Sequence, residues 1–311
     1  MTGEQSWRVI GPLSGRLTVS DEDGRPRFRR PGQPDADSRT AASRANARLI
    51  LHRTAVAVVT TDPRTGEEKF GGLDDTPVRI WAVETDLGQR RGDDLSARLA
   101  ARRARALELL AAARKLRVLV IEIEPQAALI TGTGAGGIRN VGIELDGTHG
   151  WPVIPASGLK GVAAAYAMDM PSPQDSDPIF GTPRPGRETD ERPVTPGTVL
   201  FFDARPGPDS VTVAQHDLTP HARDYHTDGD QHGDRIAPAE YFNPVPIPFL
   251  AVDGGTFIAY LVGPEKDVTK AATLLCEAMD DVGVGAKTSA GYGYLTATAR
   301  PLAAAAPAAG R

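Results

Sequence analysis

The order of apolar and polar positions predicts a chain in which strands and helices alternate. Residues 118–124 form a run of valine, leucine and isoleucine that begins to alternate with glutamate, as a largely buried strand does. Other strands are predicted from β-branched or aromatic runs, and helices from apolar residues spaced three and four apart. The predicted strands are residues 49–59, 78–83, 118–124, 198–204, 210–213, 256–262 and 292–298, and the predicted helices are 93–116, 155–168 and 267–281.

From residue 118 onward, with loops set aside, the predicted order is strand, helix, strand, strand, helix, strand. This is the order of a split βαβ unit, in which two helices cover one face of an antiparallel sheet. We therefore expect an α+β protein with a ferredoxin-like, RRM-like core. Additional strands and a helix are expected in front of that core.

Loop-forming residues set the expected domain boundaries, because 33 glycines and 26 prolines among 311 residues exceed the usual share. Residues 1–45 are charged and rich in proline and glycine, which predicts a flexible N-terminal arm. A single domain is expected over residues 46–299, with insertions at 171–196 and 214–244. Residues 300–311 are mostly alanine and proline and predict a disordered tail.

Charge and cysteine content narrow the function classes. Residues 1–117 carry 22 Lys and Arg against 16 Asp and Glu, whereas residues 118–311 carry 13 against 24. A net charge of −5 argues against a free-standing, sequence-independent nucleic-acid binder but leaves room for local phosphate contacts. A single cysteine, Cys276, excludes an internal disulfide framework and a cysteine-rich zinc site. The sequence shows no membrane span or secretion leader, so a cytoplasmic location is expected.

The strongest candidate for chemistry is the segment VGVGAKTSAGYG at residues 282–293, between the last helix and the last strand. Glycines at 283, 285, 291 and 293 let the backbone approach a ligand closely. Successive amides there can form an anion-binding nest, and Lys287 adds a charge. Thr288 and Ser289 add hydroxyl donors, and Tyr292 offers a ring for stacking on a base. This convergence predicts contact with phosphate or RNA; purely structural turns remain the alternative.

A second candidate lies at the start of the helix predicted over residues 155–168. Ser157 is a plausible N-cap, and Lys160 falls in the first helical turn. Free amides and the helix dipole favour an anion at such a position. A capped helix with a solvated lysine explains the same residues.

Two further patterns are weaker evidence for a cofactor or metal site. The segment GTGAGG at residues 132–137 matches a dinucleotide fingerprint, but a hairpin rather than a helix is predicted after it, so a nicotinamide cofactor is rejected. Histidines at 216, 221 and 226 recur every five residues, which fits no regular metal motif on a helix. No metal or cofactor is therefore expected, and the role of His216, His221 and His226 stays open.

Two stretches together resemble the RAMP superfamily of CRISPR-associated RNA-binding proteins. WPVIPASGLKG at residues 151–161 is similar to the family's Gly-x-Pro-x-Ile-Pro-Gly-Ser-Ser-x-Lys-Gly run, and GVGAKTSAGYG at residues 283–293 is similar to its glycine-rich loop before the last strand. Residues 179–181, 197–204, 217–221 and 243–250 are similar to the branch of the family found in type III-B (Cmr) effector complexes. The resemblance covers roughly residues 118–298.

The resemblance implies a RAMP fold and a non-catalytic, RNA-binding and assembly subunit of a type III-B CRISPR ribonucleoprotein in antiviral defence. The subunit would grip the guide RNA backbone near its 3′ end. Implied partners are the guide RNA, complementary target RNA, and other RAMP and small helical subunits. By match to the family motifs, the implied RNA-contacting residues are Ser157, Lys160, Gly283, Gly285, Lys287, Thr288, Ser289, Gly291 and Tyr292, with Arg139 as an added charge.

Two other function classes remain open. Some RAMP relatives cleave RNA without metal, so a guide-processing endoribonuclease could use His149 or His221 as general base or acid. Neither histidine lies within the two motifs. The other class is an α+β protein that binds a small molecule, and saturation of the glycine segment by a nucleotide without RNA affinity would support it.

Overall fold

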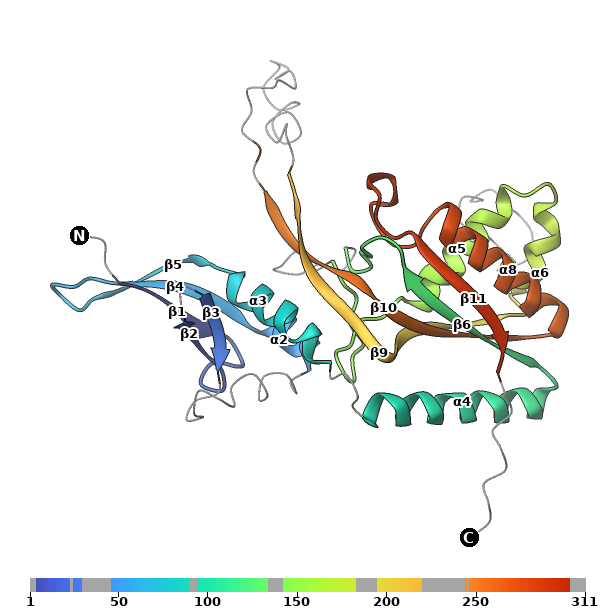
Figure 1. Cartoon of the computed structure of the whole chain (residues 1–311), viewed down its shortest axis with the longest axis horizontal. Coiled ribbons are helices and arrows are strands. Elements are labelled where there is room, and N and C mark those ends of the chain that lie inside the picture. The colour runs from blue at the N-terminus through green and yellow to red at the C-terminus, as the bar shows by residue number, and fades with distance from the viewer. Residues whose placement is uncertain are drawn as a thin grey trace, which may run out of the picture.

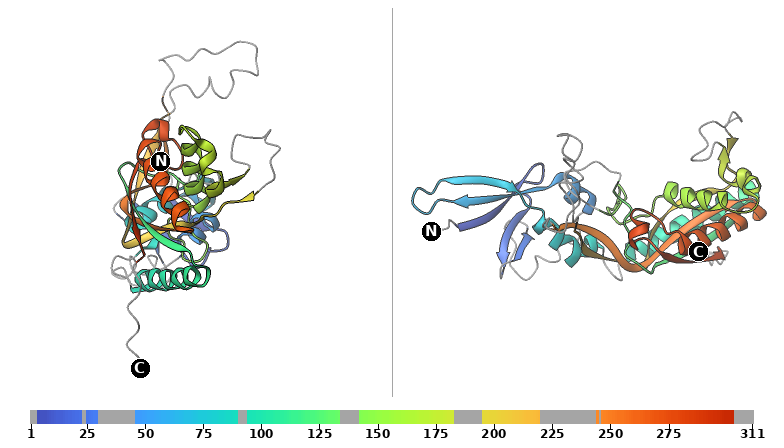
Figure 2. Two further views of the ribbon diagram at one scale, coloured as in Figure 1. Left: turned by 90° about the vertical axis from the view of Figure 1, so that its right-hand side faces the viewer. Right: turned by 90° about the horizontal axis from the view of Figure 1, so that it is seen from above.

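The structure is a computed structural model, and it describes residues 4–22, 25–29, 46–89, 94–133, 142–182, 195–219, 244 and 246–302. The chain has an N-terminal unit at one end and a larger unit, built on a four-stranded sheet, at the other (Figures 1 and 2). Both are mixtures of helix and antiparallel sheet, so the protein is α+β, as the sequence predicts.

The larger unit contains the predicted strand and helix order. Its elements are β6 (Arg117–Pro125), α5 (Ala156–Met168), β9 (Leu200–Leu218), β10 (Ile247–Gly263), α8 (Glu265–Asp281) and β11 (Leu295–Pro301). The strands lie in the order β11-β6-β10-β9, and each neighbouring pair is antiparallel. The two strands predicted at 198–204 and 210–213 are parts of one strand, β9, which begins at Leu200.

Helices cover both faces of this sheet (Figure 2, left). In β6, Leu119, Ile121 and Ile123 belong to the core that includes α5 and α8. Val118 and Val120 point the other way and pack with Leu107 and Ala111 of α4 (Asp94–Arg114). Alternate residues of a strand face opposite sides, so a strand covered on both sides is apolar along its length. This explains the continuous hydrophobic run in β6.

The N-terminal unit differs from the expected flexible arm. β1 (Glu4–Ile10) pairs with β4 (Ala55–Thr61), which pairs with β5 (Glu68–Leu73), and β2 (Thr18–Glu22) pairs with β3 (Arg25–Arg29). Buried Val9, Leu17 and Phe28 join the main core. These apolar anchors are scattered among charged residues, so composition alone obscured them. Residues 30–45 of the expected arm lie outside the described residues.

Two predicted strands in this unit are helices. Residues 49–53 belong to α2 (Ala47–Arg53), which starts where the Asn46 side chain accepts a hydrogen bond from the Leu49 amide at 3.3 Å. Residues 55–59 of the same prediction are a strand, in β4, so only its first part was wrong. Residues 78–83 belong to α3 (Thr76–Glu84), which has a proline in its first turn. Val78, Trp81 and Ala82 are buried at helical spacing. A capping residue and a proline one position into the helix decided these segments, against the β-branched composition.

The two predicted insertions are partly described. The first contains η3 (Pro173–Ser176), α6 (Asp177–Phe180) and the short pair β7 (Gly181–Thr182) and β8 (Thr195–Pro196). In the second, β9 continues to Leu218 and β10 begins at Ile247, and the two form a long hairpin that reaches beyond the sheet (Figure 1). Residues 220–243 lie outside the described part. β11 extends to Pro301, into the expected tail, of which residues 303–311 are not described.

The hairpin joins the two units. Asp86, in the 3-10 turn η2 (Asp86–Gly88) that follows α3, accepts a hydrogen bond from the Val213 amide of β9 at 3.2 Å. Arg79 of α3 donates to the Gln215 side chain at 3.1 Å. A hairpin was predicted over residues 141–154; in the described part of this segment, residues 142–154, Leu145 forms an isolated bridge with Pro152 and Ile154 forms one with Ala204 of β9.

Candidate nucleic-acid interface

The glycine segment forms a tight loop between α8 and β11, fixed by hydrogen bonds to the protein itself. The Ala286 amide donates to the Ile130 carbonyl at 2.8 Å, and the Gly293 amide donates to the Ala128 carbonyl at 2.9 Å. Within the loop, the Val284 amide donates to the Gly293 carbonyl at 2.8 Å. Several amides that a phosphate nest would need are therefore already used. These amides take no part in a nest, and anion binding by the rest of the loop stays a prediction.

The glycines of the loop serve mostly to let the chain approach itself. Gly285 has φ of +93°, and a side chain there would collide with the Ile130 carbonyl. Gly283 and Gly293 are similarly close to neighbouring backbone. Gly291 differs, because its φ is +88° but nothing lies within 4 Å of the position a Cβ would take. Close approach of a ligand was expected at all four glycines, and the described structure leaves space for it at Gly291.

Lys287 is held in an unusual backbone conformation with its side chain in solvent. Its φ and ψ are 62° and 32°, in the left-handed region that disfavours a side chain. Its carbonyl accepts hydrogen bonds from the Ala290 amide at 2.9 Å and the Tyr292 amide at 3.3 Å, which fix this conformation. The loop thus presents an exposed ammonium group from a rigid base. Ser289 is also exposed, whereas Thr288 is half-buried.

Tyr292 connects the loop to the β9–β10 hairpin. Its ring lies 5.7 Å from the His216 ring, edge to face, and 5.9 Å from the Phe249 ring. The Tyr292 hydroxyl is 3.4 Å from Nδ1 of His216, and Nε2 of His216 is 3.6 Å from an Asp253 carboxylate oxygen. Histidine 216, whose role the sequence left open, is therefore part of the loop's surroundings. No local sequence signal could have found it, because the pairing of β9 with β10 places His216 opposite Phe249.

The second predicted site, at the start of α5, is built differently from the expectation. Pro155, not Ser157, is the N-cap residue of α5. The Ala156 amide donates to the Asp203 carboxylate of β9 at 2.8 Å. The protein's own anion thus occupies the position expected to attract an external one. Ser157 is exposed and Lys160 is half-buried, so both side chains remain near the surface.

Of the other candidate residues, His149 is in the described part of the chain, whereas Arg139, His221 and His226 lie outside it. His149 follows a turn made by Asp146, which accepts hydrogen bonds from the His149 and Gly150 amides at 2.7 Å each. Nδ1 of His149 is 3.2 Å from the Asp146 carboxylate. No group of three or more His, Cys, Asp or Glu able to hold a metal ion occurs within the described ranges.

The electrostatics around Asp146 follow from its neighbours. Burial opposes ionisation, but the His149 and Gly150 donors together with the charge of Arg205, 3.4 Å away, outweigh it and lower the pKa of the carboxyl. Asp146 is therefore ionised at neutral pH. No helix in the described part of the chain has the length and apolar character needed to cross a membrane.

Comparison with known proteins agrees with this architecture. The model of a family described as the RAMP superfamily matches residues 122–296. The CRISPR system Cmr subunit Cmr6 of Pyrococcus furiosus is 27% identical over 233 residues, covering 58% of this chain and 68% of that protein. The CRISPR system CMR subunit Cmr6 of Saccharolobus solfataricus is 28% identical over 160 residues, covering 50% of this chain and 48% of that protein.

Among solved structures, a chain in the cryo-EM structure of the type III-B Cmr-beta complex bound to cognate target RNA is similar in fold. Its TM-score is 0.52 with 22% identity, and the match covers 73% of this chain and 72% of that chain. At this identity, the likeness concerns the fold alone.

Proposed function

Because the chain belongs to the RAMP superfamily, we propose that it is a non-catalytic, RNA-binding and assembly subunit of a type III-B CRISPR ribonucleoprotein in the cytoplasm. Its partners would be the guide RNA, complementary target RNA, and other RAMP and small helical subunits. The Cmr6 names of the two similar proteins support membership of such a complex. The strand order β11-β6-β10-β9 supports a ferredoxin-like, RRM-like core.

The observation that carries the RNA-binding role is the exposed Lys287. Its side chain projects from a backbone conformation that costs about 1–2 kcal/mol for a residue other than glycine. Strain of this kind at an exposed cation, fixed by two hydrogen bonds, is typical of a functional position. A lysine is suited to a phosphate because its ammonium group acts as a mobile point charge. The RNA backbone would pass over this loop.

The proposal is tested by purifying the tagged full-length chain from its native host and identifying the accompanying RNA and proteins. We expect several RAMP subunits and a short guide RNA. Lys287→Ala is expected to reduce the guide RNA recovered per subunit. Lys266→Ala, which removes an exposed lysine from the first turn of α8, is the matched control and is expected to leave recovery unchanged. An RNA-free monomer without these partners would overturn the proposal.

A guide-processing endoribonuclease remains the second candidate, and one observation favours it. A carboxylate bonded to a histidine ring nitrogen, as in Asp146 and His149, orients the imidazole for general base catalysis. The test is incubation of the pure protein with repeat RNA in EDTA. Specific cleavage that is lost in His149→Ala but kept in His52→Ala, which changes an exposed histidine of α2, would favour this function. Absence of cleavage by the wild type would exclude it under those conditions.

A further inference from the structure

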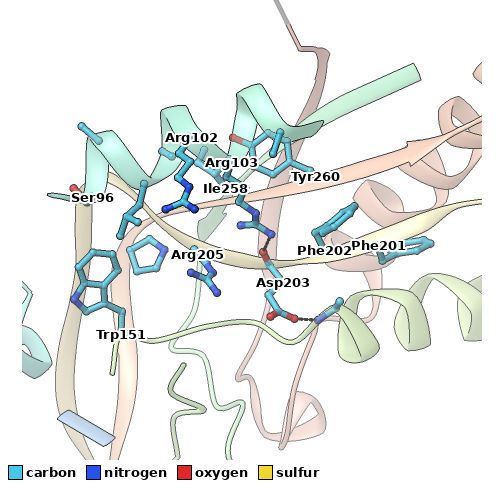
Figure 3. Close-up of a pocket in the computed structure, with 17 residues that line it drawn as sticks. Ser96, Arg102, Arg103, Trp151, Phe201, Phe202, Asp203, Arg205, Ile258 and Tyr260 are labelled. Atoms are coloured by element: carbon cyan, nitrogen blue, oxygen red, sulfur yellow. Dashed lines mark hydrogen bonds between the residues drawn. The ribbon is translucent and has the colours of Figure 1, made fainter. Parts of the chain in front are cut away.

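A pocket of about 610 Å³ lies between α4 and the sheet, and it shares no residue with the glycine loop. Arg102 and Arg103 enter it from α4, Arg205 from β9 and Tyr260 from β10, while Trp151 borders it from the segment before α5 (Figure 3). Small-molecule sites in proteins have volumes of about 300–1,000 Å³. The pocket is therefore large enough for one nucleotide.

The pocket carries an excess of positive charge. Arg102 extends from α4 toward β9, and Arg205 extends from β9 on the side away from α4, so both guanidinium groups line the pocket (Figure 3). Arg103 donates to the Asp203 carbonyl at 2.7 Å and lies over the Tyr260 ring at 5.1 Å, so its position is fixed by the protein. Burial lowers the pKa of Arg103, and the charge of Arg205 lowers it further. The positive charges of Arg103 and Arg205 thus repel one another.

The two carboxylates near the pocket, Asp203 and Asp146, already accept hydrogen bonds from backbone amides. Asp203, the acidic residue among those lining the pocket, accepts the Ala156 amide at the start of α5. Asp146 is 3.4 Å from Arg205 but also holds the turn at His149. For Arg102, the described part of the chain contains no ion-pair partner. Arg102 therefore lacks a carboxylate partner there, and the Asp146 carboxylate beside Arg205 is shared with the turn at His149, so a phosphate group is a ligand that both guanidinium groups could bind.

Trp151 indicates which kind of phosphate compound fits. The His149 ring stacks on the indole at 4.8 Å with an angle of 26° between the planes, which fixes the orientation of Trp151. The half-buried indole also borders the pocket near Arg205. A planar aromatic ring beside a guanidinium pair matches a nucleoside phosphate, with the base against the ring and the phosphate on the arginines. An acidic peptide would satisfy the arginines but leave the indole unused.

We infer that this pocket binds one nucleotide through Arg102, Arg205 and Trp151, and that it is a second nucleotide site, separate from the loop at Lys287. The nucleotide comes either from an RNA strand or from the free pool, since both offer the same base and phosphate. The site does not depend on the function proposed for the loop, because the two are built from different residues.

The test measures quenching of tryptophan fluorescence in the full-length protein on addition of AMP, a ten-nucleotide oligoadenylate, or a ten-residue glutamate peptide. The wild type is compared with Trp151→Phe, which removes the reporter, and with Arg102→Ala. The matched control is Arg105→Ala, an exposed arginine of α4 that pairs with Glu108 and does not line the pocket. Lys287→Ala separates this site from the loop.

We expect quenching by at least one nucleotide ligand that is lost in Trp151→Phe. Arg102→Ala should weaken the affinity about tenfold, as expected when one charged hydrogen bond to phosphate is lost, whereas Arg105→Ala should change it less than twofold. Lys287→Ala should leave AMP binding unchanged. Quenching by AMP identifies a free-nucleotide site, and quenching by oligoadenylate alone identifies a strand site. Equal losses in Arg102→Ala and Arg105→Ala, quenching by the peptide alone, or no quenching would overturn the inference.

Discussion

The glycine loop and the start of α5 have similar sequence signals, glycines with a serine and a lysine, but the fold uses them in opposite ways. At the start of α5, the carboxylate of Asp203 reaches the first amide of the helix, so the backbone has its anion within the protein. In the glycine loop, amides and carbonyls pair with each other and with residues 128–130, and the Lys287 side chain is left exposed. The comparison shows that donors in a motif become a ligand site only where the fold leaves them unused.

The largest effect is expected at Gly285. Gly285→Ala places a side chain against the Ile130 carbonyl at a positive φ, so it should lower the free energy of unfolding by about 3 kcal/mol, from backbone strain together with overpacking. Gly291→Ala has a similar φ but open space around it and should cost about 1 kcal/mol. Urea denaturation of both variants measures the difference. Equal costs would show that crowding by Ile130 does not constrain the loop.

The next effect is expected at the start of α5. Asp203→Ala removes the acceptor of the Ala156 amide and should lower the free energy of unfolding by about 1 kcal/mol, the usual cost of losing a helix cap. Ser157→Ala should change it by less than about 0.5 kcal/mol, because Ser157 is exposed and is not the N-cap. Thermal or urea denaturation distinguishes the two. If Ser157→Ala proved the more costly, the view that the Asp203 carboxylate stabilises the start of α5 would be wrong.

A smaller effect, on binding rather than stability, contrasts the two lysines. Lys287→Ala should reduce the slope of log affinity for RNA against log salt concentration by about one, the value for one lost phosphate contact. Lys160→Ala should reduce it less, since Lys160 is half-buried beside a helix start that already has its anion. Filter binding at several salt concentrations gives both slopes. Identical slopes for the wild type and Lys287→Ala would remove Lys287 as a phosphate contact.

The smallest effect concerns pH and the Asp146 turn that precedes α5. Because the folded protein lowers the pKa of Asp146, its carboxylate stabilises the fold above the ordinary pKa of an aspartate. This stabilisation is lost as the pH falls through the lowered value. Asp146→Asn should therefore be less stable than the wild type at pH 7, with a difference that shrinks toward pH 3. Asp280→Asn, at an exposed position of α8, is the control and should show no such trend.

Prediction from sequence succeeded where local pattern and tertiary contact agree. The apolar run in β6 and the periodic helices α4, α5 and α8 were found within a few residues of their ends. It failed at α2 and α3, where valine, isoleucine and leucine favour a strand but Asn46 and Pro77 start helices. β1 to β3 were missed because single buried residues such as Phe28 hold strands of otherwise charged composition. β1 also depends on a partner distant in sequence, β4.

Sequence alone determined the α+β class, the order of elements from β6 to β11 and the position of the glycine loop, because these follow from periodicity and from glycine's conformational freedom over short distances. Tertiary structure decided which donors in the two motifs remain unused, the placing of His216 beside Tyr292, and the presence of Arg102 and Arg205 at one pocket. These juxtapositions join residues as much as about a hundred positions apart in the chain. No local pattern encodes them, because they arise when β9 and β10 pair within one sheet and α4 packs against that sheet.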